Sequence, residues 1–367
     1  MYLSELSLLQ FKNFDDASLK FSEKINCFVG DNGVGKTNLM DAVHYLSMCK
    51  SYFNSIDSQN IMHEKDFFVV QGEFVRNEHH DMIYCGMKRQ GGKQFKRNRK
   101  DYEKLSDHIG LFPVVMVSPA DSALITEGSE ERRRFMDGVI SQYDKAYLDD
   151  LIKYNRILLQ RNRVLKETGG HKVSEDFLLV YDYQLTSLGQ RIHTKRHDFI
   201  RELIPVFNQF YGYISGGKEP ISLTYNSQLN EMPLNDLLLQ ARQRDLMVQH
   251  TTVGIHKDDL ELQLNGFSIK KNGSQGQQKT YLVALKLSQF TFIHKATQIR
   301  PIMLFDDVFD KFDHSRVTRI LQLVSENHFG QVFITDTDRA RLESLLAETA
   351  INHRLFIVHE GKISQNV

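Results

Sequence analysis

The sequence is poor in the residues and segments that mark exported or membrane-bound proteins. It contains three cysteines, Cys27, Cys49 and Cys85, which are far apart and form no CxxC pair. Such a sparse set argues against a disulfide framework or a zinc site and fits a reducing compartment. No apolar run approaches the roughly 20 residues needed to cross a bilayer, and no signal peptide is visible at the N-terminus. We therefore expect a cytoplasmic protein, for which a membrane role would require a separate subunit.

Net charge is also absent, because 46 Lys and Arg residues balance 46 Asp and Glu residues. Any contact with nucleic acid must therefore come from a local basic patch and be sensitive to salt. The densest basic cluster lies at residues 88–100, and another lies around residues 191–201. These clusters offer cations to phosphates without base-reading geometry, although an ordinary solvated surface is the alternative for each residue. The candidate nucleic-acid contacts are Lys93, Lys96, Arg97, Arg99 and Arg196.

The pattern of apolar residues divides the chain into three segments. Short strands are predicted up to residue 118, including a buried strand at 25–29. From 119 to 250 apolar residues recur at helical spacing, and Gly169-Gly170 separates two long helices, the second of which Pro205 could kink near its end at about Phe207. Apolar strands return at 301–305 and 331–335, as expected in a parallel sheet. We predict an α/β domain formed by 1–118 and 251–367, with 119–250 inserted as a mostly helical lobe.

A glycine-rich loop follows the predicted strand at 25–29 and matches the pattern G-x-x-x-x-G-K-[ST]. Glycines let the backbone wrap a phosphate with its N–H groups pointing inward, at the N-terminus of the next helix. In this pattern the lysine reaches the β- and γ-phosphates and the hydroxyl ligates Mg²⁺. A chance match is the alternative, which the strand before the loop and the helix after it disfavour. The predicted nucleotide-binding residues are Gly30, Asp31, Asn32, Gly33, Val34, Gly35, Lys36 and Thr37.

Two acids stand at the end of the apolar strand at 301–305. Carboxylates at the carboxyl end of a parallel strand face the crevice in which such sheets bind ligands. We expect Asp306 to hold Mg²⁺ together with Thr37, and Asp307 to orient or deprotonate the attacking water. Lys36 and Asp307 are thus the catalytic candidates.

A second polar glycine loop, Asn272–Lys279, precedes a helical stretch about 30 residues before Asp306. A serine and a glycine at a helix N-terminus form a second anion-binding end. The order of P-loop, helical insertion, serine loop and acidic strand end resembles that of the ABC ATPase superfamily. In that superfamily ATP lies between two heads, and the signature loop of one contacts the γ-phosphate held by the other. The corresponding residues here are Ser274, Gln275, Gly276 and Gln277.

Several further stretches resemble one family in particular, the RecF family, and together they span nearly the whole chain. They are Ser129–Asp137, Tyr154–Arg156 with Gln160–Asn162, Gly254–Leu260, Asp306–Asp310 and Gln331–Asp338. The resemblance implies an SMC-like head with a shortened helical arm, and a weak, DNA-stimulated ATPase that uses Mg²⁺ and dimerises on ATP. It also implies binding of duplex DNA near single-strand to double-strand junctions, cooperation with RecR, and help in loading recombinase during repair and replication restart.

Some positions depart from the superfamily pattern or stay ambiguous. Asp307 replaces a common Glu and is expected to aim water less well, whereas Thr335 stands where transporters have a histidine. Lys12-Asn13-Phe14 is either near the nucleotide or an ordinary exposed turn. The region 51–62 offers Gln59 as a metal contact, a role that we do not assign to it, and Gly254–Asp259 is interpreted as a structural hydrogen-bond cluster. The rival functions are a transporter's nucleotide-binding subunit, a long-armed SMC-type tether and a P-loop small-molecule kinase.

Overall fold

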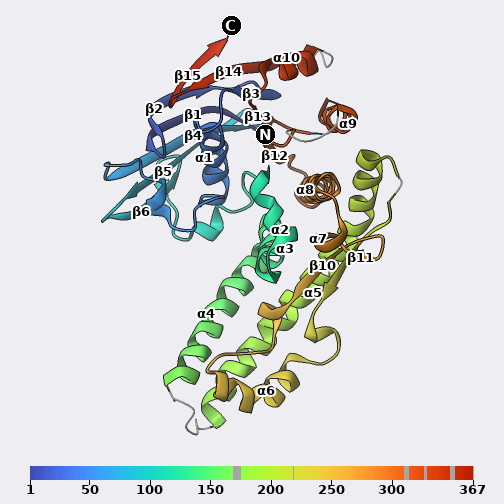
Figure 1. Cartoon of the computed structure of the whole chain (residues 1–367). Helices are drawn as coiled ribbons and strands as arrows, with labels where there is room; N and C mark the ends of the chain where they lie inside the picture. The colour runs from blue at the N-terminus through green and yellow to red at the C-terminus, as the bar shows by residue number, and fades with distance from the viewer. Residues whose placement is uncertain (168–174, 218, 310–313, 326–328, 348–351, 367) are drawn as a thin grey trace. The chain divides into compact units, whose positions relative to one another are not determined.

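The structure, a computed structural model, describes residues 1–167, 175–217, 219–309, 314–325, 329–347 and 352–366. The chain forms two compact units (Figure 1). The first comprises Met1–Ser122, Phe210–Gly217 and Gln275–Val367, and the second comprises Ala123–Gln209 and Lys218–Ser274.

The first unit contains a six-stranded sheet in the order β15-β14-β3-β13-β12-β8. All neighbours are parallel except the terminal hairpin of β14 and β15. Four of its strands are continuously apolar or nearly so and are buried along their whole length. The sequence predicted three of them, β3, β12 and β13, whereas β8 was not predicted. The strands are β3 (Ile25–Val29), β8 (Val114–Val117), β12 (Ile302–Asp306), β13 (Val332–Asp336), β14 (His353–His359) and β15 (Lys362–Asn366).

A second, antiparallel sheet in this unit has the order β2-β1-β4-β5-β6-β7. Residues of β4 alternate between buried and half-buried positions, which is the period expected of a strand with one face on a core. Phe28 of the parallel sheet, Val43 of α1 (Lys36–Met48) and Phe68 of β4 belong to one hydrophobic core. The strands are β1 (Tyr2–Phe11), β2 (Phe14–Lys20), β4 (Phe67–Arg76), β5 (His79–Lys88), β6 (Gly92–Arg97) and β7 (Lys100–Asp101).

The side-chain amide of Gln331 links the two sheets of the first unit. Its Nε2 donates hydrogen bonds of 2.8 Å to the carbonyls of Leu3 and Ser22, and its Oε1 accepts one of 2.8 Å from the N–H of Leu3. Gln331 is buried, so the amide replaces water for three backbone groups. The first strand of the chain is thereby fixed to the loop just before β13.

The helices of the first unit include α8, which is buried through most of its middle turns and packs against β8 and η3. A helix with apolar residues on all sides is expected in such a buried position. The elements are α1, α8 (Gln275–Thr297), α9 (His314–Ser325), α10 (Arg339–Ala347), η1 (Asp57–Asn60), η2 (Leu105–Asp107) and η3 (Pro119–Ser122).

The second unit is mostly helical, as predicted, and carries a small sheet in the order β11-β10-β9. Its two long helices are α4 (Lys145–Glu167) and α5 (Glu175–Ser215), and the predicted turn at Gly169-Gly170 lies outside the described residues. Pro205 does not end α5 near Phe207, because the helix continues to Ser215. The other elements are α2 (Ala123–Thr126), α3 (Ser129–Ile140), α6 (Leu234–Val248), α7 (Ile269–Asn272), η4 (Gln228–Asn230), η5 (Ile255–Lys257), β9 (Ile221–Asn226), β10 (Asp259–Leu264) and β11 (Phe267–Ser268).

The predicted return to the first domain at residue 251 is wrong. Residues up to Ser274 belong to the second unit, because β10 pairs with β9, as in the register Leu260 with Tyr225. The turn pattern after residue 250 therefore indicates strands of the insertion and not of the main sheet. Among the described helices, none is both long enough and apolar enough to cross a membrane.

Candidate nucleotide-binding site

The loop between β3 and α1 has the backbone of a phosphate-binding loop. Gly33 and Gly35 have φ angles of 84° and 112°, in the left-handed region that glycine adopts without steric cost. A Cβ at Gly35 would lie 2.3 Å from Nδ2 of Asn13, and one at Gly30 would lie 2.2 Å from the carbonyl oxygen of Val358. The close approach of a backbone carbonyl therefore requires glycine at position 30, and the positive φ favours it at position 35.

Lys36 opens α1, and its ammonium group lies over the loop. Its Nζ donates hydrogen bonds to the carbonyls of Gly30 at 2.5 Å and Asp31 at 2.8 Å. Burial lowers the pKa of Lys36, while the carboxylates of Asp307 and Asp306 oppose that shift. The cation is therefore held by the loop carbonyls and lies within the electrostatic influence of the acids at the end of β12.

Asp306 is the point at which the loop helix and three strand ends meet. Thr37 Oγ1 donates to its Oδ1 and Oδ2 at 2.9 and 3.0 Å, and Thr335 Oγ1 donates to Oδ1 at 2.9 Å. Ser118 Oγ makes a longer contact of 3.4 Å with Oδ2. Burial raises the pKa of Asp306, and these hydroxyl donors partly offset the shift. The structure thus brings together Thr37 and Asp306, the two predicted metal ligands.

Sequence reasoning missed Ser118 and the hydrogen bond from Thr335 to Asp306. Ser118 and Thr335 lie at the carboxyl ends of β8 and β13, which are the two neighbours of β12 in the sheet. A search for polar residues at the ends of the buried strands would have added Ser118 to Thr335, which the sequence had already singled out. Their separation from Asp306 along the chain hides the connection, because strand order is not written in the sequence.

Asp307 follows β12 with a φ of 49°, in the left-handed region that aspartate tolerates better than most residues. Its backbone N–H donates to Thr335 Oγ1 at 2.9 Å. Thr335 therefore holds both acids, one through its donor and one through its acceptor. Asp310 lies outside the described residues.

The predicted signature loop ends at the N-terminus of α8. Ser274 is the last residue of the second unit and Gln275 is the first of α8, and both are exposed. Gly276 and Gln277 are half-buried, and the carbonyl of Gly276 accepts a hydrogen bond of 2.8 Å from Thr280 Oγ1. An exposed serine at the N-terminus of a long helix suits an anion.

Lys12 and Asn13 do not form an ordinary exposed turn. Asn13 Nδ2 donates to the carbonyl of Val34 in the loop at 2.9 Å, and Lys12 Nζ lies 2.6 Å from Asp41 Oδ2 in α1. Both residues thus brace the P-loop and its helix. Gln59 is exposed in η1, and the described hydrogen bonds of Asp306 come from other residues.

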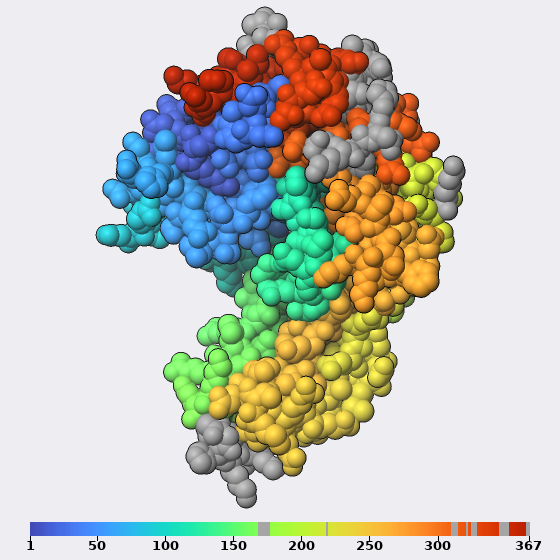
Figure 2. Space-filling view, viewed as in Figure 1, coloured from blue at the N-terminus to red at the C-terminus, as the bar shows by residue number. Residues whose placement is uncertain are grey.

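Most of the predicted nucleic-acid contacts of the first unit already have acidic partners. Lys93 Nζ bonds to Asp57 Oδ2 and the carbonyl of Cys49, both at 2.7 Å, so its charge is already neutralised by a partner. Arg97 forms two hydrogen bonds with Asp81, and Lys96 Nζ lies 3.9 Å from Asp101 Oδ2. Arg99 is exposed, and no hydrogen bond or ion pair joins its side chain to any residue that the structure describes. The segment of residues 88–100, in light blue, lies at the surface in Figure 2.

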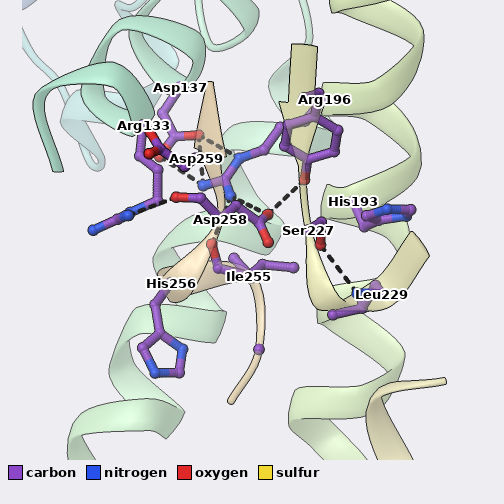
Figure 3. A network of polar contacts seen from close by, with 12 residues as sticks. Arg133, Asp137, His193, Arg196, Ser227, Leu229, Ile255, His256, Asp258 and Asp259 are labelled. Atoms are coloured by element: carbon purple, nitrogen blue, oxygen red, sulfur yellow. Dashed lines mark hydrogen bonds and ion pairs between the residues drawn. The ribbon is translucent and has the colours of Figure 1, made fainter. Parts of the chain in front are cut away.

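Arg196, the predicted contact of the second unit, is a buried structural residue. Its guanidinium bonds to both carboxylate oxygens of Asp137 at 3.0 Å, to Asp258 Oδ2 at 2.8 Å and to the carbonyl of Ile255 at 2.8 Å (Figure 3). Burial favours a lower pKa for Arg196, but the carboxylates outweigh it and raise the pKa above its ordinary range. A side chain enclosed in this way cannot reach a DNA phosphate, so the prediction for Arg196 is wrong.

The same network accounts for the motif at Gly254–Asp259. Asp258 also accepts a hydrogen bond from the hydroxyl of Tyr225 at 2.5 Å, and its carbonyl accepts one from Arg133 at 2.6 Å. Arg132 pairs with Asp259 at 2.6 Å. The interpretation of the motif as a structural hydrogen-bond cluster is confirmed by these contacts.

A P-loop after β3, an acid at the end of β12, an inserted helical unit and a serine loop at the start of α8 define the ATP-binding head of an ABC-type ATPase. The family model "RecF/RecN/SMC N terminal domain" matches residues 2–361. A Bacteroides fragilis protein named "DNA replication and repair protein RecF" is 52% identical over 366 residues, covering 100% of this chain and 98% of the relative. A protein of Flavobacterium johnsoniae with the same name is 47% identical over 357 residues, covering 97% of this chain and 99% of the relative. The chain belongs to the RecF family.

Solved structures agree with this assignment. The structure described as "recombination mediator protein RecF-ATP in RecFOR pathway" is 30% identical, with a TM-score of 0.89 over 100% of this chain and 98% of that chain. An SMC head bound to the C-winged helix domain of ScpA has a TM-score of 0.59 at 16% identity, over 100% of this chain and 98% of that chain, which shows a shared fold. The predicted fold class, an SMC-like ATPase head with an inserted helical lobe, is confirmed.

Proposed function

We propose that this protein is an ATP-dependent DNA-binding protein of recombinational repair and replication restart. The observation that carries the proposal is the contact of Thr37 Oγ1 with Asp306 at 2.9 and 3.0 Å beside the P-loop. The names of the relatives, which include a RecF solved with ATP, support both the nucleotide and the repair role. We expect the protein to bind this DNA in the cytoplasm.

The residues at the loop fit Mg·ATP. Mg²⁺ prefers oxygen ligands and is commonly held by one or two carboxylates together with phosphates and water. Thr37 and Asp306 supply a hydroxyl and a carboxylate, and among the described residues no group of three or more His, Cys, Asp or Glu forms a site built from protein alone. The bound cation would neutralise phosphate charge. Lys36 would turn from the loop carbonyls toward the β- and γ-phosphates.

Hydrolysis would rest on Asp307. Its carboxylate would orient or deprotonate the attacking water, and Thr335 would fix its backbone through the hydrogen bond of 2.9 Å. The side chain is one methylene shorter than Glu, which places the carboxylate farther from water and is consistent with slow turnover. Slow turnover gives the ATP-bound protein time to act before hydrolysis ends that state.

ATP would also be the link between two copies of the chain. The exposed Ser274 and the N-terminus of α8 offer an anion site that the P-loop of the same copy does not need. Binding energy from the nucleotide favours the dimer, because the second half of the site exists only there. We expect Ser274→Arg to leave nucleotide binding intact and to block ATP-induced dimerisation, measured by sedimentation; equal loss of both would place Ser274 in the site of its own copy.

Duplex DNA would contact exposed cations at the two ends of β6, around the turns that join β5 to β6 and β6 to β7. The cations there that have no acidic partner among the described residues differ from most of those predicted, since Lys93 and Arg97 are engaged by acids. Contacts with phosphates position a protein without reading sequence, which suits a gap that can arise anywhere. Single-strand to double-strand junctions, RecR and, through it, recombinase are the expected partners. The exposed basic residues are Lys88, Arg89, Arg99 and Lys100.

The decisive experiment measures the mass of the full chain in solution without nucleotide, with ADP and with Mg·ATP, each with and without duplex DNA. We expect a dimer with Mg·ATP that binds the duplex, and loss of that dimer in Lys36→Met. A Lys36→Met protein that still dimerises with ATP would refute the mechanism. Retention of wild-type protein on DNA only with Mg·ATP would also exclude the transporter subunit and the small-molecule kinase.

A further inference from the structure

A buried chain of polar contacts joins α8 to Asp306 within the first unit. Lys286, in the middle of α8, places its Nζ 2.6 Å from Asp121 Oδ1 in η3, and both side chains are almost wholly buried. Asp121 Oδ2 accepts a hydrogen bond of 2.8 Å from the backbone N–H of Ser118. Ser118 Oγ then donates to Asp306 Oδ2 at 3.4 Å. The helix that begins with the signature loop is thereby connected to the proposed metal ligand.

Tyr52 fixes the middle of this chain. Its hydroxyl donates to Asp121 Oδ1 and accepts from Lys286 Nζ at 3.1 Å. Its backbone N–H donates to Asp41 Oδ1 of α1 at 2.6 Å. Asp121 therefore has defined partners on both carboxylate oxygens, and its position follows α8, the end of β8 and the segment after α1.

Stability alone does not explain a lysine at this place. Removing a lysine and an aspartate from water is costly, and apolar residues of similar volume often serve as well or better in a core. The best-attested benefit of such a pair is that it fixes one relative position of two elements. Here those elements are α8 and the corner at Ser118.

The contact between Ser118 and Asp306, at the end of this series of polar contacts, is the one most easily changed. Val117 pairs with Phe305 in parallel register, so Ser118 stands beside Asp306 at the same edge of the sheet. A distance of 3.4 Å is long for a hydroxyl donor, and hydrogen bonds of this kind prefer about 2.7–2.8 Å. A small shift of η3 would therefore strengthen or remove the hold of Ser118 on the carboxylate.

We propose that Lys286 is a positioning residue which, through Asp121 and Ser118, couples the position of α8 to the orientation of Asp306. Contact between the signature loop and a nucleotide on a second copy would then set the metal-binding geometry in the first copy. This consequence rests on the proposed function, because it requires the loop to act between copies. Thr37 and Thr335 hold Asp306 through hydrogen bonds that do not involve Lys286, Asp121 or Ser118.

The test is a Mg²⁺ titration of ATP hydrolysis by the full chain, with ATP binding in EDTA measured alongside. Lys286→Met is expected to raise the Mg²⁺ concentration for half-maximal rate by about tenfold, as for other residues that orient a metal ligand. ATP binding in EDTA should not change, since the P-loop is intact. Gln289→Met is the matched control: it replaces a buried polar residue of the same helix whose Oε1 has no partner among the described residues, and it should behave as wild type.

Two further variants separate positioning from a general loss of structure. Ser118→Ala removes the hydrogen bond to Asp306 at the other end of this series of contacts. The double variant Lys286→Met/Ser118→Ala should therefore need no more Mg²⁺ than the worse of the two single variants. Lys286→Met/Asp121→Asn removes the carboxylate charge that Lys286→Met leaves buried without its partner, and should keep the raised Mg²⁺ requirement while restoring folding. Multiplying defects, or a wild-type Mg²⁺ requirement in the folded variants, would overturn the coupling. Wild-type protein that neither hydrolyses ATP nor dimerises would instead refute the proposed function.

Discussion

Arg196 offers the sharpest test of the structure, because the sequence and the fold assign it different roles. The guanidinium side chain is 2% exposed and is shared between Asp137 and Asp258, which are 20% and 1% exposed. Arg196→Met keeps the volume but leaves both carboxylates without their cation. Loss of one partner from a buried ion pair costs about 3–5 kcal/mol.

The structure places the expected value at the lower end of that range. Asp137 can regain contact with water, and Asp258 keeps the hydrogen bond from Tyr225. We therefore expect a loss of about 3 kcal/mol, or about 6–12 °C in the unfolding midpoint, at about 2–4 °C per kcal/mol for a domain of this size.

The assay is unfolding of the full chain by urea and by heat, followed by circular dichroism, with DNA binding measured on the same samples. Arg191→Met is the control, since Arg191 is 54% exposed in its pair with Asp150 and such pairs contribute about 0–1 kcal/mol. An Arg196→Met protein with an unchanged midpoint and weakened DNA binding would return Arg196 to the DNA surface and refute the assignment.

Three other predictions follow from the site and the core. Asp306→Asn should lower Mg²⁺-dependent hydrolysis by about 100-fold or more and leave ATP binding in EDTA intact, because the P-loop is unchanged; equal loss of both would mean that Asp306 supports the loop itself. Arg99→Glu with Lys100→Glu should weaken duplex binding and reduce the slope of log affinity against log salt by about 0.9 per lost phosphate contact, measured by fluorescence anisotropy, and an unchanged slope would exclude the β6–β7 turn as a DNA contact. Burial raises the pKa of Cys27 and Cys49 to about 12, so native protein should resist a thiol reagent at pH 8. The free energy of unfolding should also fall as pH rises from about 9 towards 12, because the thiols ionise in the unfolded state but not in the folded state. Rapid labelling of native protein without denaturant would contradict the burial of these thiols.

The parts of the fold that the sequence predicts best are those with local signals. The P-loop needs only the run from Gly30 to Thr37, and the strands at β3, β12 and β13 follow from continuous apolar runs. Both depend on residues that are neighbours in the chain. The long helices α4 and α5 follow equally from periodic apolar residues such as Tyr147 and Leu185.

The failures have a common physical cause, which is that partners lie far apart in the sequence. In the sequence Arg196 resembles a surface cation, because its partners Asp137 and Asp258 are far away along the chain. The same holds for Lys93 and its partner Asp57. The sequence shows where the basic residues are but not which acidic residues pair with them in the fold. The boundary at residue 251 failed in the same way, since β10 is defined by its pairing with β9.

The position of β3 between β13 and β14 has a consequence for synthesis on the ribosome. Cys27 of the strand that leads into the P-loop pairs with Ile334 on one side and Leu355 on the other, so both neighbours are made long after the loop itself. The whole second unit is translated in between. A nascent chain therefore carries the loop without either neighbouring strand until β13 and β14 emerge, so nucleotide capture is expected only after both strands have been translated.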